Sequence, residues 1–338
     1  MISVDCLHIR FNRLLLLTVG LWPYQRSKLV KLQFTLLFSV LATYILGQFA
    51  TFLTSQCTPD LLINVLATAL CYITFAINYG LLSINVEVIK CLLEQLQDTW
   101  DELTDENEIN IIKQYAIYAK RYTIAFTAFF IGLIATTATG SMLIVFLQHA
   151  CGMFQIACYR IARTMTLETL RKNSLQNEYL IYKGLICAVD MHRKAMKFSN
   201  STISGFKIMF ALLIITFVMC GSLNGFLIFQ MISFECDIEE LSLRVIFIIY
   251  YFTYMFVANY IGQEIMDHND NVFVTVYNVQ WYVAPLQIQK MILFLLQRNT
   301  KAFTLNYIGG LFVGSLKGAA TLLNTGLSFF TVLRSVRN

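Results

Sequence analysis

Residues 208–234 read IMFALLIITFVMCGSLNGFLIFQMISF, a continuous run without an Asp, Glu, Lys or Arg side chain. A helix needs about 20 apolar residues to cross the roughly 30 Å of hydrocarbon in a bilayer, so this run predicts a transmembrane helix. The run does not alternate between apolar and polar residues with a period of two, which excludes the strand of a membrane β-barrel.

The rest of the chain has the same character. Of its 338 residues, 57% are apolar and only 13% are charged, and the mean hydropathy is +0.62. A soluble domain carries roughly 25% charged residues, and half that share cannot cover a water-soluble globule. The composition therefore excludes a cytosolic enzyme, a nucleic-acid-binding protein and a disordered scaffold. The 9 cysteines form no CxxC pair, so we expect no zinc site, disulfide framework or cofactor.

Other charge-free runs raise the expected number of spans to seven. Residues 122–159 would form a helix of about 57 Å, nearly twice the thickness of the hydrocarbon. The sequence TTATGS at 136–141 is the natural place for a turn between two short spans. We therefore expect an all-α, polytopic membrane protein that forms a single domain over residues 1–338. Its approximate spans are 32–53, 61–86, 122–137, 139–159, 205–234, 245–263 and 308–333.

The positions of Lys and Arg predict the orientation. The segment before the first span and those after the second, fourth and sixth spans hold 21 of the 25 Lys and Arg residues. Because these residues gather on the cytoplasmic side, we expect a cytoplasmic N-terminus and an extracellular C-terminus. G-protein-coupled receptors have the opposite orientation, and their Asp/Glu-Arg-Tyr and Asn-Pro-x-x-Tyr motifs are missing at the ends of the third and seventh spans. That class is excluded.

Two short features near the apolar runs have simple interpretations. Residues 14–22 are mostly apolar, but no small-residue cleavage site follows them, so an interfacial helix is favoured over a signal peptide. His149 lies near Cys151 and Cys158 in sequence. A helical His with scattered thiols is typical of ordinary packing rather than of a metal site.

The last span carries a polar stripe. Lys317, Thr321, Asn324, Ser328 and Thr331 recur every three or four residues, which places them on one face of a helix. A polar face within a bilayer must contact protein or water. Two interpretations follow from the residues alone: the wall of a water-filled pore, or polar contacts between neighbouring helices.

Several motifs along the chain resemble those of the insect odorant receptors. They occur in the same order as in that family and cover nearly the whole length. They are GLWP at 20–23, LQHACGMF at 147–154, the triad Ile186, His192 and Phe198, VYNVQWY at 276–282, and the C-terminal stretch 315–333.

This resemblance implies a subunit of a ligand-gated, nonselective cation channel in the plasma membrane of olfactory sensory neurons. It implies a hetero-tetramer with the odorant-receptor coreceptor, a pore lined by the seventh helix, and no catalytic or metal site. The ligands would be small volatile odorants, and membrane lipid would surround the subunit. Val332 and Val336 match positions that form a hydrophobic constriction in the coreceptor, and apolar rings can gate by dewetting. The candidate pore and gate residues are Thr325, Ser328, Val332 and Val336.

Volatile odorants are small and mostly apolar, so we expect an aromatic cavity with few polar groups. The resemblance places it among the second, third, fourth and sixth helices. Ordinary packing is the alternative for each aromatic residue, because the chain has 27 Phe and 17 Tyr. The candidate odorant-binding residues are Tyr72, Phe75, Phe126, Phe130, Met142, Phe146, Tyr250, Tyr251 and Tyr254.

The chain departs from the family pattern in two ways. The connection between the third and fourth spans is short, where the family has a long outer loop that helps to roof the pocket. Lys317 places a cation in or beside the helix that should line a cation pathway. The alternatives are a gustatory receptor, whose signature the stretch TYILGQF at 43–49 resembles, a truncated receptor without channel activity, and a non-channel membrane binding protein. The position of 43–49 in the first span rather than the last argues against the gustatory reading.

Overall fold

The computed structural model describes residues 10–25, 28–54, 58–129, 134–166, 175–233, 238–298, 306–307 and 312–337. Nearly all of them are helical, which confirms the all-α class. The helices are α1 (Arg10–Thr18), α2 (Lys28–Thr54), α3 (Pro59–Ile84), α4 (Val86–Asp101), α5 (Glu106–Phe129), α6 (Ile134–Thr164), α8 (Leu175–Ser233), α9 (Ile238–Asn278), α10 (Leu286–Arg298) and α11 (Leu316–Arg337). A 3-10 turn, η2 (Trp281–Val283), precedes α10, and β1 (Asn306–Tyr307) pairs antiparallel with β2 (Phe312–Val313), residue 306 opposite 313.

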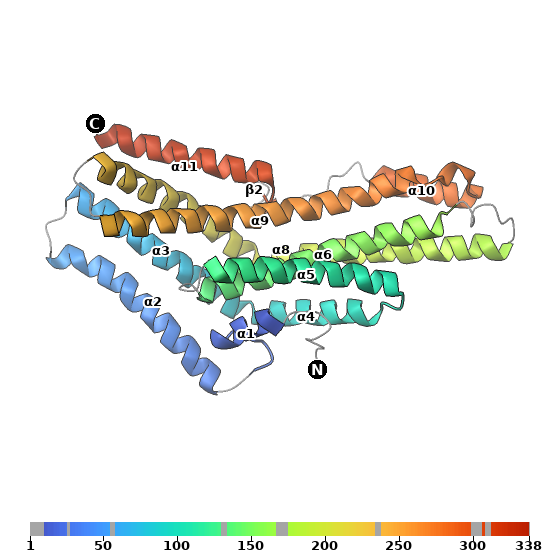
Figure 1. Ribbon diagram of the computed structural model, residues 1–338, viewed down its shortest axis with the longest axis horizontal. Coiled ribbons are helices and arrows are strands. Elements are labelled where there is room, and N and C mark those ends of the chain that lie inside the picture. The colour runs from blue at the N-terminus through green and yellow to red at the C-terminus, as the bar shows by residue number, and fades with distance from the viewer. Residues whose placement is uncertain are drawn as a thin grey trace.

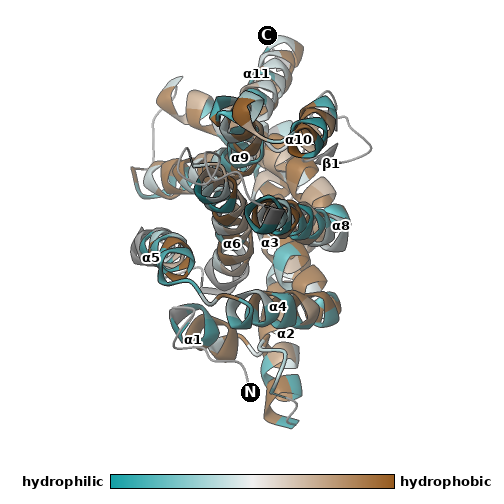
Figure 2. Cartoon of the chain, turned by 90° about the vertical axis from the view of Figure 1, so that its right-hand side faces the viewer, coloured by the Kyte–Doolittle hydropathy of each residue, from teal (hydrophilic) through white to brown (hydrophobic). Residues whose placement is uncertain are grey.

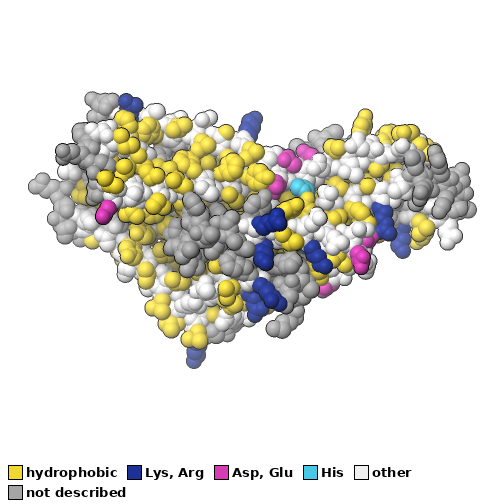
Figure 3. Space-filling view, viewed as in Figure 1, with side chains coloured by type: hydrophobic (Ala, Val, Ile, Leu, Met, Phe, Trp, Pro, Cys, Tyr) yellow, Lys and Arg dark blue, Asp and Glu magenta, His cyan; other side chains and the backbone are white. Residues whose placement is uncertain are grey.

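Five helices are long and apolar enough to cross a bilayer, by length and composition, among the residues that the structure describes. The segments are 28–52, 61–84, 140–164, 176–233 and 238–278. Helices α5 and α11 do not meet this criterion of length and composition. Helix α5 is rich in charged residues, and α11 carries the polar stripe. Figure 3 shows mostly hydrophobic side chains over the left half of one face, with most charged side chains gathered in the middle and on the right. This distribution is that of a polytopic membrane protein with an aqueous portion.

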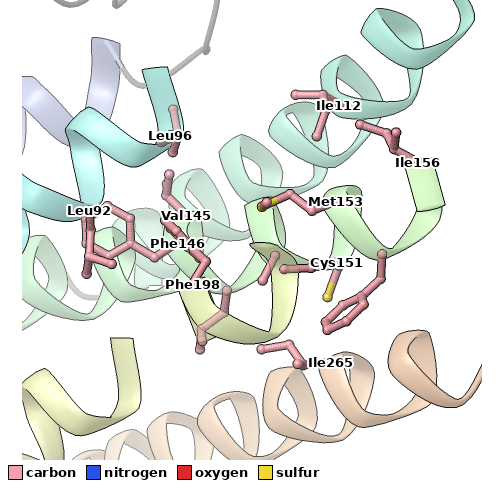
Figure 4. Packing of buried hydrophobic residues seen from close by; sticks show 14 of the residues in the cluster. Leu92, Leu96, Ile112, Val145, Phe146, Cys151, Met153, Ile156, Phe198 and Ile265 are labelled. Atoms are coloured by element: carbon pink, nitrogen blue, oxygen red, sulfur yellow. The ribbon is translucent and has the colours of Figure 1, made fainter. Parts of the chain in front are cut away.

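Helix α6 lies at the centre of the bundle. It contacts α5, α8, α9, α1, α3 and α4, which surround it when the molecule is viewed along its long axis (Figure 2). Figure 4 shows how its side chains pack against four other helices: Leu92 and Leu96 of α4, Ile112 of α5, Phe198 of α8, Ile265 of α9, and Val145, Phe146, Cys151, Met153 and Ile156 of α6 itself. Burial of each large apolar side chain from water contributes roughly 1.5–3 kcal/mol, so this cluster holds the bundle together.

One face of the first helix is covered by protein, and Leu14 on the other side is 57% exposed. Leu15 and Leu16 are buried in the same core, and the Tyr79 hydroxyl donates a hydrogen bond to the Val19 carbonyl oxygen at 2.7 Å. The chain then turns at Gly20, whose φ of +71° favours glycine. The run 14–22, expected at the membrane interface, therefore packs its apolar face against α6 and its neighbours.

The turn expected at 136–141 is wrong. These residues belong to α6, which begins at Ile134, whereas α5 ends at Phe129. The stretch contains no proline, and threonine costs a helix well under 1 kcal/mol relative to alanine, so nothing in it stops the helix. Gly140 has a packing role instead, because a Cβ there would lie 3.1 Å from Cε2 of Tyr254.

Helices α5 and α6 end well short of their neighbours. The Tyr115 hydroxyl lies 2.5 Å from Nε2 of His268, and the Gln148 amide donates to the Glu264 carboxylate at 2.7 Å. Tyr115 lies 14 residues before the end of α5, and Gln148 lies 14 residues after the start of α6. At 1.5 Å per residue, both helices therefore extend about 21 Å beyond these contacts. Counted back the same distance along α9 from Glu264 and His268, this point lies beside residues 250–254. Helix α9 extends further in the same direction, to Ile238. Figure 1 shows the left-hand ends of α5 and α6 stopping well before those of α3, α8, α9 and α11.

An ion pair joins α5 and α6 near their opposite ends, close to the start of α5 and the end of α6. Arg160 of α6 holds Glu108 of α5 with two hydrogen bonds, Nε to Oε1 at 2.7 Å and Nη2 to Oε2 at 2.9 Å. The Glu108 side chain is only 8% exposed. A buried, bidentate pair of this kind becomes costly when one partner loses its charge.

We expect Glu108→Gln to lower the free energy of unfolding by about 1–2 kcal/mol, because Arg160 would keep a half-buried charge without its carboxylate. The matched control is Glu94→Gln, whose pair with Lys90 is 3.9 Å long and exposed. It should change stability by less than about 0.5 kcal/mol. Thermal melting of the detergent-solubilised protein, followed by gel filtration, measures both. Equal melting temperatures for the two variants would contradict this assignment.

Candidate functional site

Aromatic side chains from three helices meet in one group, which we call the aromatic cluster: Tyr72 and Phe75 of α3, Phe217 of α8, and Tyr250, Tyr251 and Tyr254 of α9. The rings of Phe75 and Tyr250 meet edge to face at 6.0 Å between centroids, and those of Phe217 and Tyr251 at 5.0 Å. Phe217 also stacks on Tyr254 at 5.4 Å. The structure thus brings together five of the nine candidate odorant-binding residues.

A cavity of about 90 Å³ lies beside Tyr254. We call it the Tyr254 cavity. Its lining comes from α6, α8, α9, β2 and α11 and is almost entirely apolar. Among its polar side chains, Tyr254 offers a hydroxyl and Asn259 an amide, and such a mixture suits a small apolar molecule with one hydrogen-bonding group. The lining includes Gly140, Ile144, Phe217, Tyr254, Asn259 and Leu322.

The fourth-span candidates lie elsewhere. Met142 and Phe146 are 1% and 0% exposed and belong to the core beside Phe198, not to the lining of the Tyr254 cavity. The neighbouring face of α6, with Gly140, Leu143, Ile144 and Leu147, faces the cavity. Sequence reasoning missed these residues because it searched for aromatic and methionine side chains. Phe126 and Phe130 lie outside the residues whose side chains the structure describes.

The cavity is joined directly to the first turn of α11. The Asn259 side-chain oxygen accepts a hydrogen bond from the Ser315 backbone N–H at 3.3 Å, and its amide donates to the Met255 carbonyl at 2.9 Å. A Cβ at Gly262 would overlap the carbonyl of Gly314, so only glycine allows α9 to approach so closely. Asn259 therefore connects the cavity wall to the residue that precedes α11.

Helix α11 has two different faces. Ala319 and Leu322 are buried and Gly326 and Phe330 half-buried toward α8 and α9, while the polar stripe is exposed on the opposite side. Within the stripe, the Thr321 and Ser328 hydroxyls donate to carbonyl oxygens one turn earlier. Of the candidate pore residues, Ser328, Val332 and Val336 lie on the exposed side and Thr325 is half-buried. Val332 and Val336 are 56% and 83% exposed.

A buried cation lies at the other end of the aromatic cluster. The Arg244 side chain is 8% exposed and donates to the side-chain oxygens of Asn64 at 2.5 Å and Asn224 at 3.5 Å. It also pairs with Glu240, one turn earlier on α9. Arg244 thereby ties α9 to α3 and α8.

We expect Arg244→Met to lower the free energy of unfolding by about 2 kcal/mol, because the asparagine oxygens would lose their buried donor. Arg193→Met is the matched control, since the side chains of Arg193 and its partner Asp190 are 76% and 38% exposed, and it should cost less than about 0.5 kcal/mol. Thermal melting in detergent distinguishes them. An Arg244→Met variant as stable as the parent chain would show that the hydrogen bonds of Arg244 do not contribute to stability.

The sequence of this chain is similar to sequences of known proteins. The sequence profile of the family described as 7tm Odorant receptor matches residues 60–325. Odorant receptor 30a of Drosophila melanogaster is 26% identical over 123 residues, or 36% of this chain and 32% of that protein, so the match spans about a third of the relative's length.

The fold is also that of solved olfactory receptors. The structure of the insect olfactory receptor OR5 from Machilis hrabei in complex with eugenol superposes with a TM-score of 0.78 at 14% identity, over 98% of this chain and 100% of that one. A second OR5 structure gives a TM-score of 0.74 at 13% identity over the same shares. With a matching profile over most of its length and this shared fold, the chain belongs to the insect odorant receptors, a family of multi-pass membrane receptors and not of enzymes.

Proposed function

We propose that this chain is an odorant-binding subunit of a nonselective cation channel, and that it assembles with the odorant-receptor coreceptor as a hetero-tetramer. The observation that carries the proposal is the arrangement of α11. Its apolar face packs on α8 and α9, its polar stripe points away from the subunit, and its first turn is bonded to the wall of the Tyr254 cavity.

The exposed stripe supports a pore. Within a bilayer, a polar helix face that points away from its own subunit must meet water or other protein. Four such helices around a common axis would place their stripes against one water-filled path. Val332 and Val336 would narrow that path near the C-terminal end of the helix, where an apolar ring can exclude water.

The Tyr254 cavity supports ligand gating. A ligand shifts a conformational equilibrium only by as much as it binds one state better than the other. A molecule in this cavity contacts both Tyr254 on α9 and Leu322 on α11. Its affinity therefore depends on the relative position of these two helices. The cavity of about 90 Å³ is smaller than the roughly 300 Å³ of a typical ligand site, so an odorant must displace side chains of the wall to enter. Eugenol, which the solved OR5 relative binds, is a first ligand to test.

The subunit crosses the plasma membrane of an olfactory sensory neuron with a cytoplasmic N-terminus and an extracellular C-terminus. Helices α2, α3, α8, α9 and α11 cross fully, and α5 and α6 enter as a hairpin from the cytoplasmic side. The contacts of Tyr115 and Gln148 with α9 support this arrangement, because they leave the hairpin only about 21 Å of further reach. The subunit then has five full crossings in place of the seven expected from the sequence. Because a hairpin enters and leaves on the same side of the membrane, the expected orientation of the other spans is unchanged.

Whole-cell recording tests the function. Cells that express this chain together with the coreceptor should carry an odorant-evoked cation current that cells with this chain alone do not carry. A panel of volatiles that includes eugenol is the stimulus, and surface labelling confirms delivery. If the complex reaches the surface and no volatile evokes a current, the truncated-receptor alternative replaces this proposal. Responses to tastants only would favour a gustatory receptor.

The cavity can be narrowed at one position. Gly140→Ala should raise the odorant concentration for half-maximal current roughly ten-fold, or about 1.4 kcal/mol. The new methyl group would lie 3.1 Å from the Tyr254 ring and push it into the cavity. Gly47→Ala is the control, because a Cβ there meets nothing within 4 Å. Equal dose–response curves for the two variants would place the odorant elsewhere.

The pore assignment can be tested by thiol modification. Ser328→Cys should react with a charged, membrane-impermeant thiol reagent during channel opening and lose most of its current, because a fixed positive charge would obstruct the cation path. Ala319→Cys is the control, since Ala319 is 4% exposed, lies on the buried face of α11 and does not line the Tyr254 cavity. Current through Ser328→Cys that the reagent leaves intact would exclude this face from the pore.

The depth of the hairpin can be tested in the same way. Ile134→Cys should react with an impermeant thiol reagent neither in intact cells nor after permeabilisation, since the end of α6 lies inside the hydrocarbon. Thr58→Cys, at the start of α3, should react from outside, and Glu106→Cys only after permeabilisation. External labelling of Ile134→Cys would show that α5 and α6 cross completely.

A further inference from the structure

A second hollow lies on the far side of Tyr251 from the core. It is a groove of about 590 Å³ between α8, α9 and α11, which we call the α11 groove. This volume is within the range of sites for drug-sized molecules. Its lining is apolar apart from Asn324 and the hydroxyl of Tyr251, and it includes Gly221, Ile248, Phe252, Leu327 and Phe330.

Glycine residues keep the groove open. A Cβ at Gly221 would meet no atom within 4 Å, and one at Gly225 would meet only Phe330, at 3.8 Å. The Ser222 hydroxyl donates to the Gly326 carbonyl oxygen at 3.0 Å, so α8 and α11 are already in contact beside this space. The empty volume therefore follows from the spacing of α8 and α11.

The rim of the groove faces the surroundings of the subunit. Phe252 and Leu327 are 45% and 61% exposed although both are large and apolar. Both lie within helix segments that the proposed topology places in hydrocarbon. An apolar occupant can therefore enter from the bilayer without passing through water.

A cation lies at the end of the groove. Phe330, which lines it, meets Phe229 edge to face at 6.1 Å, and the Arg334 guanidinium lies over the Phe229 ring at 4.7 Å from its centroid. The Arg334 side chain remains exposed at the C-terminal end of α11. A guanidinium matches phosphate geometry, and at the end of a membrane helix it lies at the depth of lipid headgroups.

We propose that the α11 groove binds a membrane phospholipid, with one acyl chain between α8, α9 and α11 and the phosphate on Arg334. The lipid belongs to the leaflet at the C-terminal end of α11. It fills the space behind the polar stripe and so supports α11 against the rest of the subunit. The groove and the Tyr254 cavity are neighbours that share Phe217, Met255 and Leu322 in their walls. The proposal does not depend on odorant gating, because lipid binding is measured without an odorant.

Photochemical labelling of the assembled complex with the coreceptor tests the proposal. The complex is placed in phosphatidylcholine nanodiscs that contain either a phosphatidylcholine or a diacylglycerol probe, each with a diazirine in the middle of one acyl chain. After irradiation, labelled peptides are identified by mass spectrometry. We expect adducts on peptides that contain residues 218–225, 248–252 and 323–330, and a higher yield with the phosphatidylcholine probe.

Two variants make the test specific. Gly221→Leu should lower the groove adducts roughly ten-fold, or about 1.4 kcal/mol of binding, because its side chain occupies the open space. Gly47→Leu on α2 should leave them unchanged, since a Cβ at Gly47 also meets nothing within 4 Å. Arg334→Gln should remove the preference for the phosphatidylcholine probe, and Arg334→Lys should retain it. Arg334 is exposed, so these two variants remain informative if Gly221→Leu does not assemble.

Several results would overturn the proposal. Equal labelling of the parent complex and Gly221→Leu would mean that the probe samples only outer helix faces. Absence of groove adducts in the parent complex would mean that a neighbouring subunit covers the groove. Loss of the adducts on addition of eugenol would assign the groove to an odorant instead. An unchanged headgroup preference in Arg334→Gln would remove the phosphate site.

Discussion

The contact between α9 and the N-terminal end of α11 links the two parts of the molecule to which we assign function. At this point a side-chain oxygen of Asn259 accepts from the Ser315 backbone, and Gly262 lets the two backbones approach. The Tyr254 cavity lies on one side of the contact and the polar stripe of α11 begins on the other. The cavity and the stripe, to which we assign ligand binding and the pore, are thus separated by single side chains rather than by a long chain of residues.

The helical architecture could be predicted from the sequence, because long apolar runs are what a membrane-spanning helix requires. Residues 61–84 and 208–233 illustrate this, since both are helical where the pattern predicts helices. The helix boundary near 136–141 could not be predicted. Threonine and glycine favour a turn only when packing does not oppose it, and here the Tyr254 ring packs against Gly140.

The candidate site was predictable on α9 and not on α6. Tyr250, Tyr251 and Tyr254 share a helix face and carry large rings, so their sequence spacing already places them together. On α6, both Met142 and Ile144 are apolar, and only the tertiary arrangement decides which of them meets the core and which the cavity. The groove beside α11 depends equally on tertiary spacing, because Gly221 and Gly326 leave no signal of their own in a membrane helix.

Helix α8 is unbroken over 59 residues, which corresponds to about 88 Å at 1.5 Å per residue. Only about a third of that length fits within the hydrocarbon, and the remainder packs beside α4, α6 and α9. The membrane and aqueous portions of the subunit therefore share one continuous rod and cannot be exchanged as separate modules. In a chimaera of two receptors, a junction inside α8 would have to preserve its helical phase on both sides. Junctions at the ends of α8 avoid that requirement.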